Sequence, residues 1–118
     1  MLKVDNPQGP CNCLVVTSER HIARLIQVNL VRQKYAVSIA WNEESAIEQI
    51  DAGGFGLAIL YEPLPEIDCQ MLIKEIRTGI ASQTHVILMS PRADALRDEQ
   101  CEYRADQYIQ VRRGWLRF

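Results

Sequence analysis

The amino-acid sequence predicts a single α/β domain built on a parallel β-sheet with helices on both faces. Continuous apolar runs of strand length recur at Cys13–Val16, Leu57–Leu60 and Val86–Met89, which is typical of strands buried on both faces. Segments with apolar residues at helical spacing separate these runs, and strict alternation of this kind favours parallel strands. Right-handed crossovers then limit the topology to a doubly wound open sheet, and 118 residues make one domain.

The first strand–helix unit follows an irregular N-terminal arm, residues 1–10. After the strand Cys13–Val16, the side-chain oxygen of Thr17 or Ser18 is expected to cap a helix, and Glu19 suits the positive helix N-terminus. The apolar stripe of this helix is formed by Ile22, Leu25, Ile26 and Leu30.

The second unit starts with residues 35–40, where apolar residues alternate with small ones. This alternation predicts a strand nearer the sheet edge. Asn42 is expected to cap the following helix, and Gly53 and Gly54 to end it, because glycine accepts the left-handed conformation found at helix ends. The apolar residues of the helix are Ala46, Ile47 and Ile50.

The remaining units follow the same order. Asp68 is expected to cap a third helix, with Leu72, Ile73 and Ile76 on its apolar side. Ser90 is expected to cap a fourth helix with Pro91 in its first turn. This fourth helix is weakly apolar, and its apolar members are Ala93, Ala95, Leu96 and Cys101. Tyr108 and Ile109 belong to a short fifth strand.

Composition and charge exclude several function classes. A formal net charge of −2 gives no broad positive field for nucleic acid or an anionic membrane. No apolar stretch approaches the roughly 20 residues that span a bilayer, and the arm lacks the apolar region of a secretory signal, so a cytoplasmic protein is expected. The cysteines Cys11, Cys13, Cys69 and Cys101 do not have zinc-site spacing; structural thiols and no cofactor or metal are expected.

The residues that end the strands define the candidate site, because ligands of doubly wound sheets bind outside the carboxyl ends of the strands. These residues are Thr17, Ser18, Tyr61, Ser90 and Val111. Phosphoryl transfer needs a nucleophile, hard oxygen ligands for Mg²⁺ and a cation. None of the five residues is a carboxylate or a lysine, so the sequence predicts no catalytic site and no enzyme.

Four segments carry a resemblance to a known family: Leu14–Glu19, Leu57–Pro65, Val86–Ser90 and Ala105–Val111. With them, Cys11–Arg112 resembles a receiver domain of bacterial two-component response regulators, the CheY-like type. The resemblance implies a flavodoxin-like fold of five parallel strands. In the alignment the family's acid pair falls on Thr17 and Ser18, its phosphorylated aspartate on Tyr61 and its lysine on Val111. The chain therefore resembles a degenerate receiver, or pseudo-receiver, without phosphorylation chemistry.

Ser90 and Tyr108 match the hydroxyl and the aromatic residue of the family's switch pair. The family's fifth helix is missing or truncated here, since residues 113–118 form only a short tail after the receiver-like domain, residues 11–112. Large apolar residues and arginines in a tail of this kind are typical of protein interfaces. The switch and interface candidates are Tyr108, Arg112, Arg113, Trp115, Leu116 and Phe118. The resemblance implies a protein partner or a homodimer through the face of the fourth helix, fifth strand and tail.

The function expected from these features is a phosphorylation-independent signalling and interaction module. Two alternatives stay open: a small-molecule or anion sensor that uses the pocket of Thr17, Ser18 and Ser90, and a truncated receiver fragment of a larger regulator. An enzyme of another flavodoxin-like family is disfavoured, because no glycine-rich phosphate loop follows the first strand.

Overall fold

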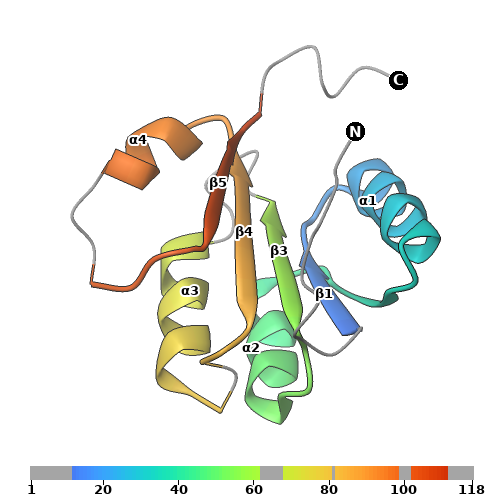
Figure 1. Cartoon of the computed structure of the whole chain (residues 1–118), viewed down its shortest axis with the longest axis horizontal. Coiled ribbons are helices and arrows are strands. Elements are labelled where there is room, and N and C mark those ends of the chain that lie inside the picture. Colours follow the sequence, from blue (N-terminus) through green and yellow to red (C-terminus); the bar gives the residue numbers. More distant parts are fainter. Residues whose placement is uncertain (1–11, 62–67, 81, 99–101, 112–118) are drawn as a thin grey trace.

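A computed structural model describes residues 12–61, 68–80, 82–98 and 102–111, in which strands and helices alternate strictly along the chain (Figure 1). The elements are β1 (Asn12–Val16), α1 (Arg20–Arg32), β2 (Ala36–Ala40), α2 (Glu43–Ala52), β3 (Leu57–Tyr61), α3 (Cys69–Thr78), β4 (His85–Ser90), α4 (Ala93–Asp98) and β5 (Gln107–Gln110). The predicted order of elements is confirmed. The described helices are all too short or too polar to cross a lipid bilayer.

The sheet has the order β2-β1-β3-β4-β5 with every neighbouring pair parallel. It is therefore the predicted doubly wound sheet, with β2 at the predicted edge position. The register places Val16 opposite Leu60, and Tyr61 opposite Met89 on the next strand. Because all strands run in one direction, their carboxyl ends lie along a single edge of the sheet.

Two apolar clusters fill the two sides of the sheet. One contains side chains of α2, α3 and α4, and the other contains Ile22, Ile26 and Leu30 of α1. Figure 1 shows α2 and α3 next to each other and α1 separated from both by the strands. The alternation of side chains along β1, β3 and β4 supplies both clusters, which is why these strands are buried throughout their apolar runs.

The ends of α2 and the start of α3 follow the sequence prediction. The Asn42 side chain accepts a hydrogen bond from the Ser45 N–H at 2.8 Å, and Asp68 accepts one from the Met71 N–H at 3.1 Å. Gly53 and Gly54 have φ values of 74° and 91°, a backbone region that favours glycine. These caps fix where the chain leaves and re-enters the sheet.

Two predicted caps are wrong. The N-cap of α1 is Glu19 and makes no side-chain cap hydrogen bond, because the helix starts at Arg20 and Thr17 and Ser18 lie too far before it. Likewise α4 starts at Ala93, so Ser90 is the last residue of β4 and Pro91 lies in the connection that precedes the helix. Within the described residues α4 covers Ala93–Asp98, and Cys101, predicted as a member of this helix, lies outside them.

A network around Arg77 joins the end of α3 to the segment before β5. The guanidinium donates to the carbonyls of Ser82, Thr84 and Arg104 at 2.7 to 3.0 Å, and to the Asp106 carboxylate at 2.6 Å. The same carboxylate oxygen accepts a hydrogen bond from the Val86 N–H at 2.7 Å. We refer to Arg77 and Asp106 with these contacts as the Arg77–Asp106 clamp, and it fixes the approach of the chain to β5.

Candidate functional site

The predicted site residues lie along the carboxyl edge of the sheet. Tyr61 and Ser90 are the last residues of β3 and β4, and Thr17 and Val111 directly follow β1 and β5. Thr17 and Ser90 are 0% exposed, Tyr61 is 1% exposed and Val111 is 4% exposed, whereas Ser18 is exposed. The strand ends are thus lined by buried, uncharged side chains.

Both buried hydroxyls take part in the turns that follow their strands. The Thr17 Oγ1 accepts a hydrogen bond from the Glu19 N–H at 3.1 Å, and the Ser90 Oγ accepts one from the Arg92 N–H at 3.1 Å. The backbone of Ser90 is also engaged, because its carbonyl accepts from the Val111 N–H at 3.0 Å. These bonds explain why hydroxyl-bearing residues suit positions at which the chain turns from a strand toward a helix.

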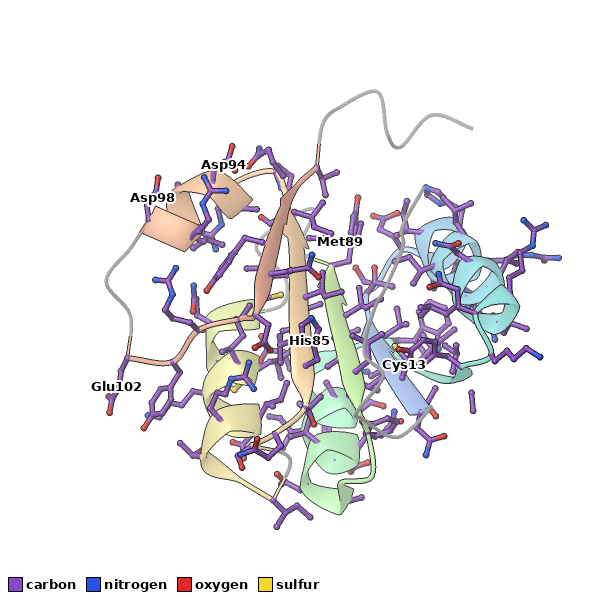
Figure 2. All side chains as sticks on the ribbon, in the orientation of Figure 1. Cys13, His85, Met89, Asp94, Asp98 and Glu102 are labelled. Atoms are coloured by element: carbon purple, nitrogen blue, oxygen red, sulfur yellow. The ribbon has the colours of Figure 1, made fainter. Side chains whose placement is uncertain are left out.

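Tyr61 fills space on the α1 side of the sheet. Its side chain belongs to the same apolar cluster as Met89 and Val111, and Figure 2 shows Met89 toward the carboxyl end of β4. The phenolic oxygen is buried and has no hydrogen-bond partner among the described residues. Burial raises the pKa of the Tyr61 phenol, and the negative charge of Glu19 raises it further.

The side chains at the strand ends do not fit a magnesium ion. Mg²⁺ is held in proteins by carboxylate oxygens, and the positions that would provide them carry Thr17, Ser18 and Tyr61. No group of three His, Cys, Asp or Glu side chains suited to a metal occurs within the described ranges. The position of the family's charge-neutralising lysine is the buried Val111. The described residues that end the strands thus carry no positive charge that would balance a transferred phosphoryl group.

The Tyr108 side chain is held within its own segment. Its hydroxyl oxygen accepts a hydrogen bond from the Ala105 N–H at 3.0 Å, and the Arg104 guanidinium lies 5.4 Å from the ring centroid. The half-buried ring packs against the cluster on the α4 side of the sheet. Arg104 also donates to the carbonyl of Arg97 on α4, so the ring, α4 and the start of β5 are joined.

Gln110 makes a second connection between β5 and the start of α4. Its side-chain oxygen accepts from the Asp94 N–H at 2.9 Å, and its side-chain nitrogen donates to the Pro91 carbonyl. Asp94 and Asp98 project from the outer side of α4, as Figure 2 shows. Sequence reasoning missed Gln110 and the Arg77–Asp106 clamp, because no local pattern signals partners that lie far apart in the chain.

The other predicted site residues divide into buried and undescribed ones. Cys13 and Cys69 are buried, and burial raises the pKa of the Cys13 thiol to about 12. Cys11 and Cys101 lie outside the described residues. So do the interface candidates Arg112, Arg113, Trp115, Leu116 and Phe118, together with the arm and tail boundaries.

Comparisons with known proteins give a consistent picture, although no family model matches the chain. The chain is 33% identical to the uncharacterized transcriptional regulatory protein YkoG of Bacillus subtilis, over 73% of this chain and 37% of YkoG. It is 25% identical to the response regulator ArlR of Staphylococcus haemolyticus, over 83% of this chain and 44% of ArlR. The chain therefore spans less than half the length of these curated relatives.

Solved structures share the fold. The response regulator TrrA of Thermotoga maritima, solved with Mg²⁺ and BeF, has a TM-score of 0.72 and 26% identity, covering 88% of this chain and 89% of TrrA. A signal receiver domain from Bermanella marisrubri has a TM-score of 0.73 and 24% identity, covering 85% of this chain and 84% of that one. Both agree with the doubly wound sheet described above.

Proposed function

Because the chain belongs to the receiver-domain family of two-component response regulators, we propose that it is a cytoplasmic signalling module that works through protein contacts, without aspartyl phosphorylation and without enzymatic activity. One observation carries this proposal: the carboxyl edge of the sheet has a buried tyrosine, two buried hydroxyls and a buried valine. Such side chains offer neither an aspartyl acceptor nor a ligand set for Mg²⁺.

Treatment with acetyl phosphate and Mg²⁺, followed by intact-mass measurement, tests the loss of phosphorylation. The expected result is an unchanged mass, with a phosphorylatable receiver domain treated in parallel as the positive control. The Tyr61→Phe variant is the matched control, because it removes the phenolic oxygen and keeps the ring. A phosphoryl group on the unaltered chain would contradict the proposal, and its absence from the Tyr61→Phe variant would place that group on the phenol.

The face of α4 and β5, continued by the tail, is the proposed contact surface for a protein partner or a second copy. Tyr108, Arg104 and Gln110 support this assignment, because their bonds hold α4 and β5 in one arrangement without a phosphoryl group. A surface held in this way is ready for a partner without a conformational step. In the tail, Trp115 and Leu116 are proposed to add apolar area to it.

The mass of the protein in solution, measured by light scattering with and without Trp115→Ala, tests the homodimer. At high salt, which weakens contacts between exposed charges, a dimer that Trp115→Ala converts to monomer is expected. Equal monomer masses for both proteins would contradict the homodimer and leave the hetero-complex, which a pull-down from the native cell with both proteins then tests. A partner captured equally by the two proteins would contradict the contribution of Trp115.

A second candidate function, a small-molecule or anion sensor, is favoured by the buried Tyr61 hydroxyl, which has no hydrogen-bond partner among the described residues. A ligand that accepts a hydrogen bond from the phenol would raise the melting temperature by mass action. A melting screen with anions and nucleotides tests this function, with Tyr61→Phe as the control. A shift of equal size in both proteins would exclude a site at Tyr61.

A further inference from the structure

The helices α1 and α2, which lie on either side of the edge strand β2, carry opposite charge. Arg20, Arg24 and Arg32 lie in α1, which has no acidic residue, and Lys34 follows in the next turn. The exposed acids of α2 are Glu44, Glu48 and Asp51, and α2 has no basic residue. The β2 end of the sheet therefore has a basic helix on one face and an acidic helix on the other, although the net charge of the chain is only −2.

These charges are not neutralised within the described part of the chain. Arg20, Arg24 and Arg32 form no ion pair there, and neither do Glu48 and Asp51. The cations of α1 cannot meet the acids of α2 in the same molecule, because the two helices pack into different apolar clusters on opposite sides of the sheet (Figure 1). Only a second molecule can bring the two surfaces together.

The two surfaces match in spacing as well as in sign. On α1, Arg20, Arg24 and Val28 follow one another at i, i+4 and i+8 along the exposed side, so they repeat at about 6 Å. On α2, Glu44 and Glu48 have the same i, i+4 separation, again about 6 Å. Two helices with equal repeats can pair several opposite charges at once, which isolated surface ion pairs cannot do.

Apolar side chains extend both surfaces in matching directions. Val28 and Val31 continue the basic stripe of α1 and are 45% and 56% exposed. Trp41 lies one residue before the N-cap of α2 and is 44% exposed. When α1 faces an α2 that runs in the opposite direction, the arginines meet the acids and the valines extend past the start of α2 toward Trp41.

From this match we propose that α1 of one molecule docks on α2 of a second copy, in the opposite orientation. The contact is head-to-tail, because each copy offers a basic–apolar helix on one side and an acidic helix on the other. Such heterologous contacts generate rings or open arrays. The proposed contact between α1 and α2 uses a surface separate from the α4–β5 face and does not depend on the proposed function.

Sedimentation velocity over a range of protein concentrations tests the contact. Three proteins are needed: the unaltered chain, a variant with Arg20→Glu and Arg24→Glu, and a variant with Glu48→Lys and Asp51→Lys. Arg20→Glu and Asp51→Lys suit the helix ends at which they lie, since acids favour the N-terminus and bases the C-terminus. Arg24 and Glu48 are exposed positions inside their helices, and circular dichroism verifies that both variants fold. The Lys74→Glu variant, on the exposed side of α3, is the control for an unrelated charge change.

The unaltered chain is expected to self-associate, more strongly at low salt, because salt shortens the range of attraction between exposed charges. Each double variant alone is expected to associate at least about tenfold more weakly, a change of about 1.4 kcal/mol. An equimolar mixture of the two variants is expected to restore association, because the basic α1 of one then meets the acidic α2 of the other. Lys74→Glu is expected to behave as the unaltered chain.

Three results would overturn the proposal. The first is an unaltered chain that stays monomeric at low salt, and the second is a mixture that associates no better than the separate variants. The third is a monomeric chain that binds duplex DNA or vesicles of anionic phospholipid and loses this binding with Arg20→Glu and Arg24→Glu. That third result would assign α1 to a different anionic partner.

Discussion

The hydroxyl of Tyr61 is buried at the end of β3 within a cluster of apolar side chains, and no described residue is its hydrogen-bond partner. A buried polar group left unsatisfied costs about 1 to 3 kcal/mol, whereas the aromatic ring stabilises the fold by filling the space next to Met89 and Val111. The ring and the hydroxyl of this residue therefore act on stability in opposite directions.

Removing only the hydroxyl separates these two effects. Tyr61→Phe is expected to leave the free energy of unfolding unchanged or to raise it by about 1 kcal/mol, because the penalty for the buried oxygen disappears. Urea denaturation measures this change. The control is Tyr61→Ala, which removes the ring and is expected to lower the free energy of unfolding by about 3 to 5 kcal/mol. A decrease of more than about 1 kcal/mol for Tyr61→Phe would mean that the hydroxyl has a partner after all.

Cys13 is expected to be chemically inert in the folded protein. Burial raises its pKa to about 12 from an ordinary 9.0, and only the thiolate is an effective nucleophile. Alkylation at pH 8 mapped by mass spectrometry is expected to leave Cys13 unmodified in buffer and to modify it in urea. Modification at equal rates in both conditions would contradict the buried position of the side chain.

The raised pKa of Cys13 also makes the stability of the fold depend on pH in the alkaline range. Between pH 9 and 12 the thiol of Cys13 ionises in the unfolded chain while the native thiol stays protonated. The free energy of unfolding therefore falls over that range and is unaffected by this group below it.

At the scale of elements, the Arg77–Asp106 clamp holds α3, β4 and the approach to β5 in one arrangement. Partial burial pushes the pKa of the Asp106 carboxyl upward, but the hydrogen bond from the Val86 N–H and the bond and charge of Arg77 outweigh it, with a smaller contribution from His85. The net effect is a pKa below the usual value of an aspartate. The charged carboxylate is thus the form that stabilises the fold.

This direction predicts a dependence on acid. The pKa of Asp106 is lower in the folded chain than the ordinary 3.8. The carboxylate therefore contributes fully to stability at pH values above 3.8, and this contribution is lost as the pH falls through the pKa of the folded state. Asp106→Asn is expected to lower the free energy of unfolding at pH 7. Below pH 4 the free energy of unfolding of the variant is expected to fall less steeply with decreasing pH than that of the unaltered chain, and urea denaturation at pH 7 and below pH 4 measures both effects.

The control for this experiment is Asp98→Asn, whose side chain on α4 is 77% exposed. It is expected to change the free energy of unfolding little, as substitutions of exposed charges generally do. If Asp106→Asn and Asp98→Asn had equal effects at both pH values, the clamp would not be the source of the acid dependence.

At the scale of the whole molecule, the sequence predicts the sheet because its signals are local and repeated. Continuous apolar runs identify β1, β3 and β4, and alternation over 35–40 identifies β2 as an edge strand. Two helix starts were misplaced because Thr17, Ser18 and Ser90 stand at the strand ends, and a cap preference alone does not say how many residues separate a strand from the next helix. The number of residues that the chain needs to pass from the end of a strand to the next helix determines where that helix starts.

The candidate site was predictable in composition and not in its bonding. The neutral residues at the strand ends follow from aligning the strands, and Thr17, Tyr61, Ser90 and Val111 lie at or directly after the carboxyl ends of β1, β3, β4 and β5. The unsatisfied hydroxyl of Tyr61 depends on where its ring packs, which no local pattern encodes. The bond between Arg77 and Asp106 spans 29 positions, so it too is a product of the fold.

Burial across the sheet predicts a gradient of local stability. The central strand β3 is buried at every position, whereas β5 lies at the edge and is only partly buried, next to the six-residue helix α4. Amide hydrogen exchange is expected to be slowest in β1, β3 and β4 and faster in β5 and α4, because local opening exposes less apolar surface there. Mass spectrometry of peptic fragments measures this, and equal protection of β3 and β5 would contradict it.

The packing of Tyr61 also bears on evolutionary reversibility. A single change of Tyr61 to aspartate would insert a carboxylate into an apolar cluster next to Val111, near the negative charge of Glu19. Such a group, with no cation to balance it, would stay protonated or destabilise the domain. An aspartate at this position therefore needs compensating changes around it, because the space accommodates an aromatic ring and the described neighbours in the cluster are apolar.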